Sequence, residues 1–175
     1  MNVIYFAHGK ESGPKGRKIS TLAEVGRARG YHIESLDYRH MADPQDRVEM
    51  LLRRLTDHPG RVILVGSSMG GYVSILASAA IKPAGLFLMA PAVYLPGYAV
   101  QEPTPWAEKT AIVHGWQDEV VPPENVTRFA RRHRAELHMV NDDHVLKEQL
   151  PFITELFGWF LDQFEAAPST PEAGT

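Results

Sequence analysis

One stretch of the sequence, residues 61–81, limits the folds that the chain can adopt more than any other. It opens on the apolar run Arg61-Val62-Ile63-Leu64-Val65 and continues, after five residues, into a segment with helical spacing of its apolar positions. Those positions are Tyr72, Val73, Leu76, Ala77 and Ala80. A β-branched run of this kind is typical of a strand that is buried on both faces. The stretch therefore predicts a buried strand that turns directly into a helix.

The turn between this strand and this helix is the pentapeptide Gly66-Ser67-Ser68-Met69-Gly70, a G-x-S-x-G pattern. A strand that turns straight into a helix imposes a strained backbone on the residue at the turn, and glycines on both sides keep Cβ atoms away from it. Ser68 would then project its hydroxyl above the sheet, where the free N–H groups of the helix also point. The pattern predicts that Ser68 is a nucleophile, with Ser67 as the competing hydroxyl. A Gly/Ser-rich turn without chemistry is the alternative.

The rest of the chain alternates between apolar runs and helical patterns. The expected strands lie at 3–7, 32–36, 61–65, 84–89, 111–113 and 136–140. Helices are expected around Ile19 to Ala23, from Asp43-Pro44, from about Tyr72, from Pro122-Pro123, and from Leu146 to Phe160. Strands that are apolar throughout and alternate with helices predict an α/β fold, with a mostly or wholly parallel sheet of about six strands and helices on both faces.

Length and composition narrow the class of protein. A chain of 175 residues suits one domain; we expect residues 1–164 to form it and the polar, proline-bearing residues 165–175 to be a disordered C-terminal tail. The net charge of -3 gives no reason to expect nucleic acid or an anionic membrane as a partner. The first residues carry no basic region typical of a signal peptide, and no apolar run is long enough to span a membrane. Together with the absence of cysteine, these features fit a cytoplasmic enzyme.

Polar side chains follow four different expected strands, namely His8, Ser68, Asp118 and His144. Because ligands of parallel sheets bind beyond the carboxyl ends of the strands, we expect these residues at one edge. A serine hydroxyl needs a base to accept its proton, and an imidazole oriented by a carboxylate supplies one. The chain order Ser68, Asp118, His144 is the order nucleophile, acid, base of one large class of hydrolases. It predicts a catalytic triad, with Glu119 as the alternative acid.

The intermediate of such a reaction carries an oxyanion, which needs backbone donors. One donor is expected to be the N–H of Met69, directly after the nucleophile. The other is expected in the loop after the first strand, where we choose the N–H of Lys10, with Glu11 and Ser12 as alternatives.

Two further groups of residues have a functional and a structural interpretation. His8 and His114 could be imagined as metal ligands, but their spacing matches no zinc pattern, so we expect no metal. A structural role for His8, holding the oxyanion loop, is favoured. Four aromatic residues form a possible substrate pocket or simply pack down a proline-rich loop: Tyr94, Tyr98, Trp106 and Trp116.

Taken together, these motifs resemble those of small α/β-hydrolases of the YqiA-like esterase type. The resemblance rests on the His-Gly after the first strand, the G-x-S-x-G pattern, the H-G-x-x-D-x-x-V-P that begins at His114, and the D-D-H that ends at His144; it extends to about residue 164. It implies a parallel sheet with the elbow near its middle, a nucleophile at Ser68, an acid at Asp118 and a base at His144. Compared with larger members, the chain lacks the first two strands, and the segment between its fourth and fifth strands is too short for a lid domain. An exposed cleft is therefore expected.

The combined reading is a serine hydrolase that cleaves carboxylic esters or thioesters of small, soluble acyl groups through an acyl-enzyme intermediate. We expect a small-molecule ester substrate and no cofactor, metal, nucleic acid or membrane. Two alternatives share the same sequence features. One is a peptidase or amidase that uses the same triad, and the other is a hydrolase-like binding or scaffolding protein with little catalysis.

Overall fold

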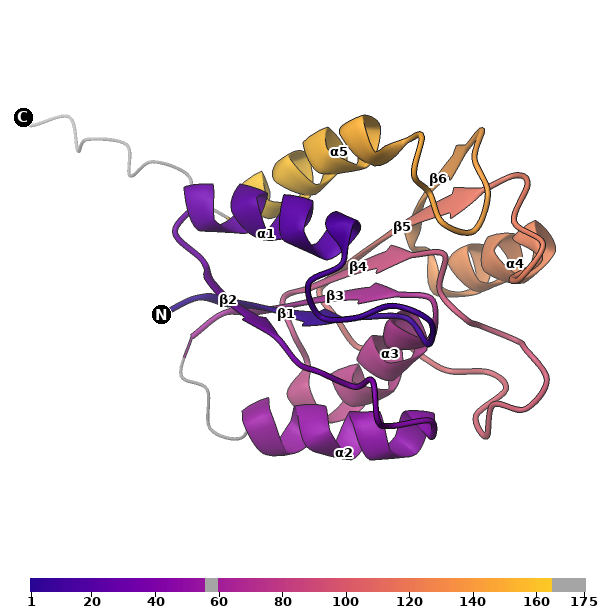
Figure 1. Ribbon diagram of the computed structural model, residues 1–175, viewed down its shortest axis with the longest axis horizontal. Helices are drawn as coiled ribbons and strands as arrows, with labels where there is room; N and C mark the ends of the chain where they lie inside the picture. The colour runs from indigo at the N-terminus through magenta and orange to yellow at the C-terminus, as the bar shows by residue number, and fades with distance from the viewer. Residues whose placement is uncertain (56–59, 165–175) are drawn as a thin grey trace, which may run out of the picture.

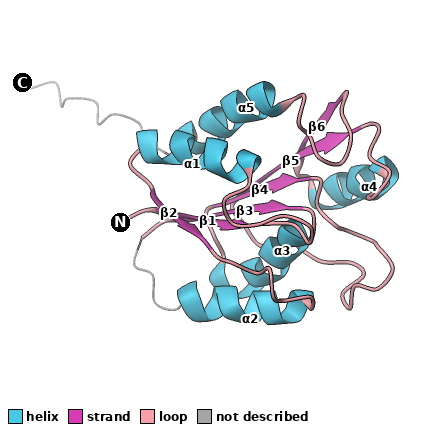
Figure 2. Cartoon of the chain, viewed as in Figure 1, coloured by secondary structure: helices cyan, strands magenta, loops and turns pink. Residues whose placement is uncertain are grey.

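The structure, a computed structural model, describes residues 1–55 and 60–164, and the expected tail at 165–175 lies outside these residues. Strands and helices alternate along this part of the chain (Figure 1, Figure 2). In chain order they are β1 (Val3–Ala7), α1 (Arg17–Ala28), β2 (His32–Ser35), α2 (Pro44–Leu55), β3 (Val62–Ser67), α3 (Met69–Ile81), β4 (Gly85–Met89), β5 (Lys109–Gly115), α4 (Pro123–His133), β6 (Glu136–Val140) and α5 (Leu150–Asp162).

The strands form one sheet in the order β2-β1-β3-β4-β5-β6, and every neighbouring pair is parallel. The predicted fold class, a parallel sheet of about six strands in an α/β fold, is confirmed. The last residues of neighbouring strands are in register, as Ser67 is with Met89 and Gly115 is with Val140. The loops that leave the carboxyl ends of the strands therefore meet at one edge, and β3 and β4 lie in the middle of it.

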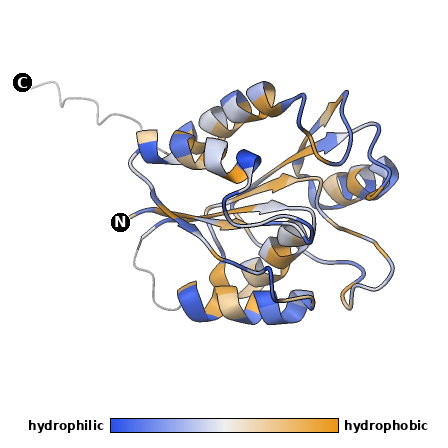
Figure 3. Cartoon of the chain, in the orientation of Figure 1, coloured by the Kyte–Doolittle hydropathy of each residue, from blue (hydrophilic) through white to orange (hydrophobic). Residues whose placement is uncertain are grey.

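Helices cover both faces of the sheet, with α1 and α5 on one face and α2, α3 and α4 on the other (Figure 1). Strand β3 shows why the central strands are mainly apolar. Val62 and Leu64 pack in the cluster under α2, α3 and α4, while Ile63 and Val65 pack under α1 and α5. All of them are buried, and much of the central part of the sheet is orange in Figure 3.

The last helix begins later than the sequence pattern predicts. Leu146 was expected in the helix, but it lies in the loop before α5 with φ of +58°. The apolar pattern included Leu146 because this residue is buried in the core beside α1 and α5, although it is not helical. Pro151 occupies the first turn of α5, where its fixed φ and missing N–H are tolerated. Residues 146–149, which were expected in the helix, belong instead to the loop that carries His144.

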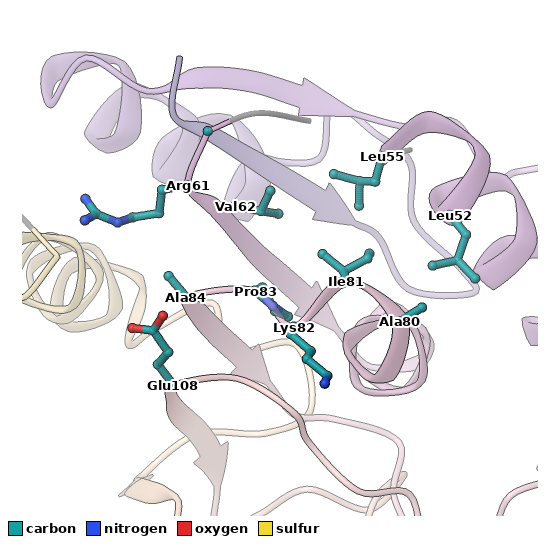
Figure 4. Close-up of a pocket in the computed structure, with 11 residues that line it drawn as sticks. Leu52, Leu55, Arg61, Val62, Ala80, Ile81, Lys82, Pro83, Ala84 and Glu108 are labelled. Atoms are coloured by element: carbon teal, nitrogen blue, oxygen red, sulfur yellow. The ribbon is translucent and has the colours of Figure 1, made fainter. Parts of the chain in front are cut away.

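A cavity of about 580 Å³ lies at the amino ends of β3 and β4. Val62, Ala84 and Ile81 line it together with Leu55 of α2 (Figure 4). This edge of the sheet is opposite to the one where the predicted site residues are expected. None of the helices in residues 1–55 and 60–164 has the length and apolar character of a membrane span.

Candidate active site

Ser68 occupies the turn between β3 and α3 in a left-handed backbone conformation, with φ of 54° and ψ of -119°. A non-glycine residue rarely adopts this conformation, and such strain is held only where the surroundings fix it. Here the N–H of Ser68 donates to the carbonyl of Met89 at 2.9 Å, and its carbonyl accepts from the N–H of Gly71 at 2.9 Å. The helix begins at Met69, immediately after the serine.

The glycines of the pentapeptide are required by close backbone approaches. A Cβ on Gly70 would overlap the carbonyl oxygen of Ala7, at the end of β1. A Cβ on Gly66 would overlap the carbonyl of Gly70 itself. The first turn of α3 therefore packs directly against the end of β1, which brings the loop after β1 to Ser68.

The structure brings the side chains of Ser68, His144 and Asp118 together in one hydrogen-bonded row. The Oγ of Ser68 lies 3.0 Å from Nε2 of His144, and Nδ1 of His144 lies 2.7 Å from Oδ2 of Asp118. These residues follow the carboxyl ends of β3, β6 and β5, as the sequence predicts. Asp118 is buried, whereas about a fifth of the His144 side chain, 22%, is exposed. The row therefore runs from the interior to a surface that a substrate can reach.

The hydrogen bonds of Asp118 determine which nitrogen of His144 carries the proton. Oδ1 of Asp118 accepts from the N–H groups of Val120 and Val121, both at 2.8 Å. Burial alone would raise the pKa of Asp118, but the hydrogen bonds from His144 and from these backbone groups lower it further than burial raises it. An ionised carboxylate can only accept, so Nδ1 of His144 is the donor and Nε2 is free to accept from Ser68.

Asp142 fixes the loop that carries His144, a role that the sequence analysis did not assign. Its side chain is buried, and its two oxygens accept from the N–H of Asp143 at 2.8 Å and from the N–H of Gln149 at 2.9 Å. The carbonyl of Asp142 accepts from the N–H of Gln117, in the loop that carries Asp118. The loops that carry Asp118 and His144 are thereby tied to each other.

Ser67, the competing hydroxyl, contacts a different partner. Its Oγ accepts a hydrogen bond from Nζ of Lys18, on α1, at 3.2 Å. Burial lowers the pKa of Lys18, while Asp142, Asp118 and Asp143 act in the opposite direction. Because successive side chains of a strand point to opposite faces, Ser67 shares the face of Val65, under α1. It is Ser68, one residue on, that meets His144.

The loop after β1 passes over Ser68. A Cβ built on Gly9 would lie 3.4 Å from Cβ of Ser68. Among the described residues, no acceptor is recorded for the N–H of Met69 or for that of Lys10. Both groups are thus free for an external acceptor beside Ser68. The N–H groups of Glu11 and Ser12 are equally unbonded there, so these alternatives stay open.

His8 and His114, the imagined metal ligands, each bind to the protein backbone. Nε2 of His8 accepts from the N–H of Tyr38 at 2.9 Å, so its Nδ1 carries the proton and donates to the carbonyl of Gly9 at 2.7 Å. Nε2 of His114 donates to the carbonyl of Val121 at 3.0 Å. In the described part of the chain, no group of three or more metal-binding side chains is found.

The buried histidines predict a loss of stability on acidification. Burial lowers the pKa of both His8 and His114, so the unfolded chain takes up protons at a higher pH than the folded chain does. Protonation then favours unfolding as the pH falls below the ordinary histidine range, by at most about 1.4 kcal/mol per pH unit for each residue. We expect the free energy of unfolding, measured with urea, to be lower at about pH 5.5 than at about pH 7.5.

The variant His114→Gln tests this assignment, because a glutamine amide can keep a donor near the position of Nε2 but does not titrate. Its unfolding free energy should change less between the two pH values than that of the wild type. His40→Gln, at an exposed position, is the matched control and should follow the wild type. Equal pH dependence in all three proteins would contradict the assignment.

Three of the four predicted pocket aromatics, Tyr94, Tyr98 and Trp106, lie in the segment between β4 and β5. The ring of Tyr98 packs edge-on against Tyr72, in the first turns of α3, with centroids 4.7 Å apart. A cavity of about 440 Å³ lies beside this pair, and its lining includes Tyr72 and the neighbours of Tyr98, Gly97 and Ala99. Tyr94 instead packs against α4, with the guanidinium of Arg128 4.3 Å above its ring.

The two tryptophans of the predicted pocket, Trp106 and Trp116, lie in different parts of the structure. Trp116 follows β5 at the carboxyl edge, two residues before Asp118, and is 57% exposed. The N–H of Trp106 donates to Oγ of Ser78, ten residues after Ser68 along α3, which corresponds to about 15 Å of helix. The backbone of Trp106 therefore lies near the last turn of α3, away from Ser68. The loop of residues 90–108 has no periodicity from which its path could be predicted.

The comparisons with known proteins agree with this architecture. Residues 4–172 match the family model described as "Alpha/beta hydrolase family". A solved structure from Xanthomonas campestris pv. campestris, described as a hydrolase of the alpha/beta superfamily, is 30% identical with a TM-score of 0.83, covering 93% of this chain and 99% of that chain. An alpha-beta serine hydrolase homologue from Coxiella burnetii is 25% identical with a TM-score of 0.72, covering 92% of this chain and 85% of that chain.

A third solved structure shares the fold. It is an a/b serine hydrolase without a lid from Xanthomonas campestris, 20% identical with a TM-score of 0.71, covering 97% of this chain and 84% of that chain. Among curated proteins, the sequence comparison finds no match.

Proposed function

Because the chain belongs to the alpha/beta hydrolase family, we propose that it is a serine hydrolase that cleaves carboxylic esters or thioesters of small, soluble acyl groups. The observation that carries the proposal is the row of hydrogen bonds from Asp118 through His144 to Ser68. This row supplies a nucleophile, a base with an acceptor nitrogen facing it, and a carboxylate that fixes the tautomer of the base.

The first half of the proposed reaction forms the acyl-enzyme. Oγ of Ser68 attacks the carbonyl carbon while Nε2 of His144 takes the hydroxyl proton, and the carbonyl oxygen becomes an oxyanion. The N–H groups of Met69 and Lys10 bind that oxyanion. When the tetrahedral intermediate collapses, the bond to the alcohol or thiol breaks, and His144 returns the proton to the leaving group. The acyl group remains bonded to Ser68.

The second half repeats these steps with water. A water molecule attacks the acyl carbon while His144 takes one of its protons, and the oxyanion forms again between the same donors. Collapse of the intermediate breaks the bond to Oγ, which takes the proton back from His144. The carboxylic acid leaves and Ser68 is regenerated. No cofactor takes part in these steps.

The proposed preference for small acyl groups rests on the short segment between β4 and β5 and on the size of a cavity lined by Tyr72, four residues after Ser68. Residues 90–108, the segment between β4 and β5, form no helix, and the cavity lined by Tyr72, Gly97 and Ala99 has a volume of about 440 Å³. Each methylene that becomes fully buried contributes about 0.8 kcal/mol to binding, and this gain ends where a pocket ends. A chain that extends into water gains nothing further.

The experiment that tests this function is a series of p-nitrophenyl esters of increasing acyl length. We expect kcat/KM to be highest for short acyl groups, such as acetyl and butyryl, and not to rise further for long ones. A matched series of thioesters and p-nitroanilides separates esterase from amidase activity, because fold and triad are common to both. Rates that rise steadily to long chains would contradict the acyl preference. An absence of hydrolysis with every member would favour a binding protein.

A further inference from the structure

Arg47, on the first turns of α2, is a buried cation that contacts the backbone of the loop after β1. Its side chain is among the largest that are fully buried, with 1% of the residue exposed. Nη1 donates to the carbonyl of His8 at 3.1 Å and lies 3.5 Å from the carbonyl of Gly9. Nε donates to the carbonyl of Met41 at 2.8 Å. The guanidinium thus joins α2 to the two residues that lead from β1 to Lys10.

No carboxylate lies within ion-pair distance of Arg47 among the described residues. Its partners are carbonyl oxygens and the ring of Tyr38, whose centroid is 5.4 Å from the guanidinium carbon. Buried arginines are usually paired with an acid, because desolvation of the charge is costly. Stability alone is therefore a poor explanation for a charge at this position, since an apolar side chain on the core-facing side of α2 would avoid that cost.

The effect of these contacts on Lys10 follows from the geometry of the peptide group. The carbonyl of Gly9 is contacted by two side chains, Nδ1 of His8 at 2.7 Å and Nη1 of Arg47 at 3.5 Å. In a planar trans peptide, the carbonyl and the N–H of the next residue point in opposite directions. Holding the carbonyl of Gly9 toward His8 and Arg47 therefore turns the N–H of Lys10 away from them. Gly9 itself packs against Ser68.

We propose that Arg47 is a positioning residue of the oxyanion hole, which holds the carbonyls of His8 and Gly9 so that the N–H of Lys10 faces the oxyanion above Ser68. This inference rests on the proposed hydrolase function. Arg47 touches neither the substrate nor the reacting atoms, and it acts only through the orientation of one peptide group. The planar guanidinium suits this task because it can donate in two directions from a fixed plane.

The test compares Arg47→Met with Val48→Ala, a neighbouring buried position on the same helix that contacts only the core. For Arg47→Met we expect kcat to fall on the order of a hundredfold, as it does when one oxyanion donor is lost, while KM changes little. Binding of a trifluoromethyl ketone, whose adduct with the serine carries an oxyanion, should weaken by the same factor. Val48→Ala should lower the melting temperature but leave kcat and ketone binding within a few-fold of wild type.

Arg47→Lys keeps the positive charge. It provides a second test of the proposal if Arg47→Met does not fold. A lysine donates to one carbonyl at a time, so we expect a smaller fall of kcat, again matched by weaker ketone binding. A folded Arg47→Lys or Arg47→Met protein with the kcat of Val48→Ala would overturn the proposal. An unchanged kcat would also overturn it if KM for the ester rises by the same factor by which ketone binding weakens. If the proposed function itself fails, the wild type hydrolyses no ester, which is a different result.

Discussion

Replacing Ser68 by alanine is expected to lower kcat for ester hydrolysis by about a millionfold, the scale seen when a triad nucleophile is removed. The reason is that no other hydroxyl lies against Nε2 of His144 in the structure; Ser68 alone does, at 3.0 Å, among the described residues. Covalent labelling by a fluorophosphonate probe should disappear with the activity. Both are measured on protein whose circular dichroism and thermal unfolding match the wild type.

The matched control is Ser67→Ala, which removes the adjacent hydroxyl. Because Oγ of Ser67 bonds to Lys18 on the face under α1, its loss should leave labelling intact and turnover within a few-fold of wild type. Labelling that survives in Ser68→Ala would show that the nucleophile has been assigned to the wrong residue. Labelling that disappears in Ser67→Ala would point to the same error.

For Asp118→Asn we expect kcat to fall by about ten-thousandfold, with a much smaller change in KM. The hydrogen bonds of Asp118 explain why. Its Oδ1 accepts from the N–H groups of Val120 and Val121, so an asparagine oxygen would stay there and its NH₂ group would face His144. Nδ1 would then have to accept, and the proton would move to Nε2, which could no longer take the proton of Ser68.

Glu119→Gln is the control for this variant, because Glu119 is the alternative acid and is exposed at the adjacent position. It should keep nearly all of the wild-type kcat. The two variants, assayed with the same short-chain ester over a range of concentrations, separate kcat from KM. Near-normal kcat in Asp118→Asn, or a comparable loss in Glu119→Gln, would move the acid away from Asp118.

The central strands β1, β3 and β4 could be predicted because they are buried on both faces, and α1, α2 and α4 because only one face of each is apolar. Val62 to Val65 alternate between two buried clusters, a situation in which only a continuous apolar run is stable. The first residue of a helix was harder to predict where a buried apolar residue lies in the loop before the helix. Leu146 is fully buried with a positive φ, so its hydrophobicity gives no information about the start of α5.

The positions of Ser68, Asp118 and His144 at one edge could be predicted because each follows a parallel strand. Residues that act through others were harder to find. Arg47 lies four residues before Leu51 and eight before Leu55, and therefore on the apolar face of α2. This spacing was a usable signal, but charged residues on helices are usually solvated, and the contacts of Arg47 are with backbone atoms that carry no sequence pattern.

The separation between the cavity at the amino ends of β3 and β4 and the carboxyl edge of the sheet has a consequence for the discovery of inhibitors. Compounds selected by how well they fill space would be directed to the 580 Å³ cavity bordered by Ile81 and Ala84, beside the last turn of α3. Compounds selected by reactivity toward serine would be directed to Ser68, before the first turn of the same helix. A thermal-shift screen and an activity-based screen of one library should therefore yield different hits.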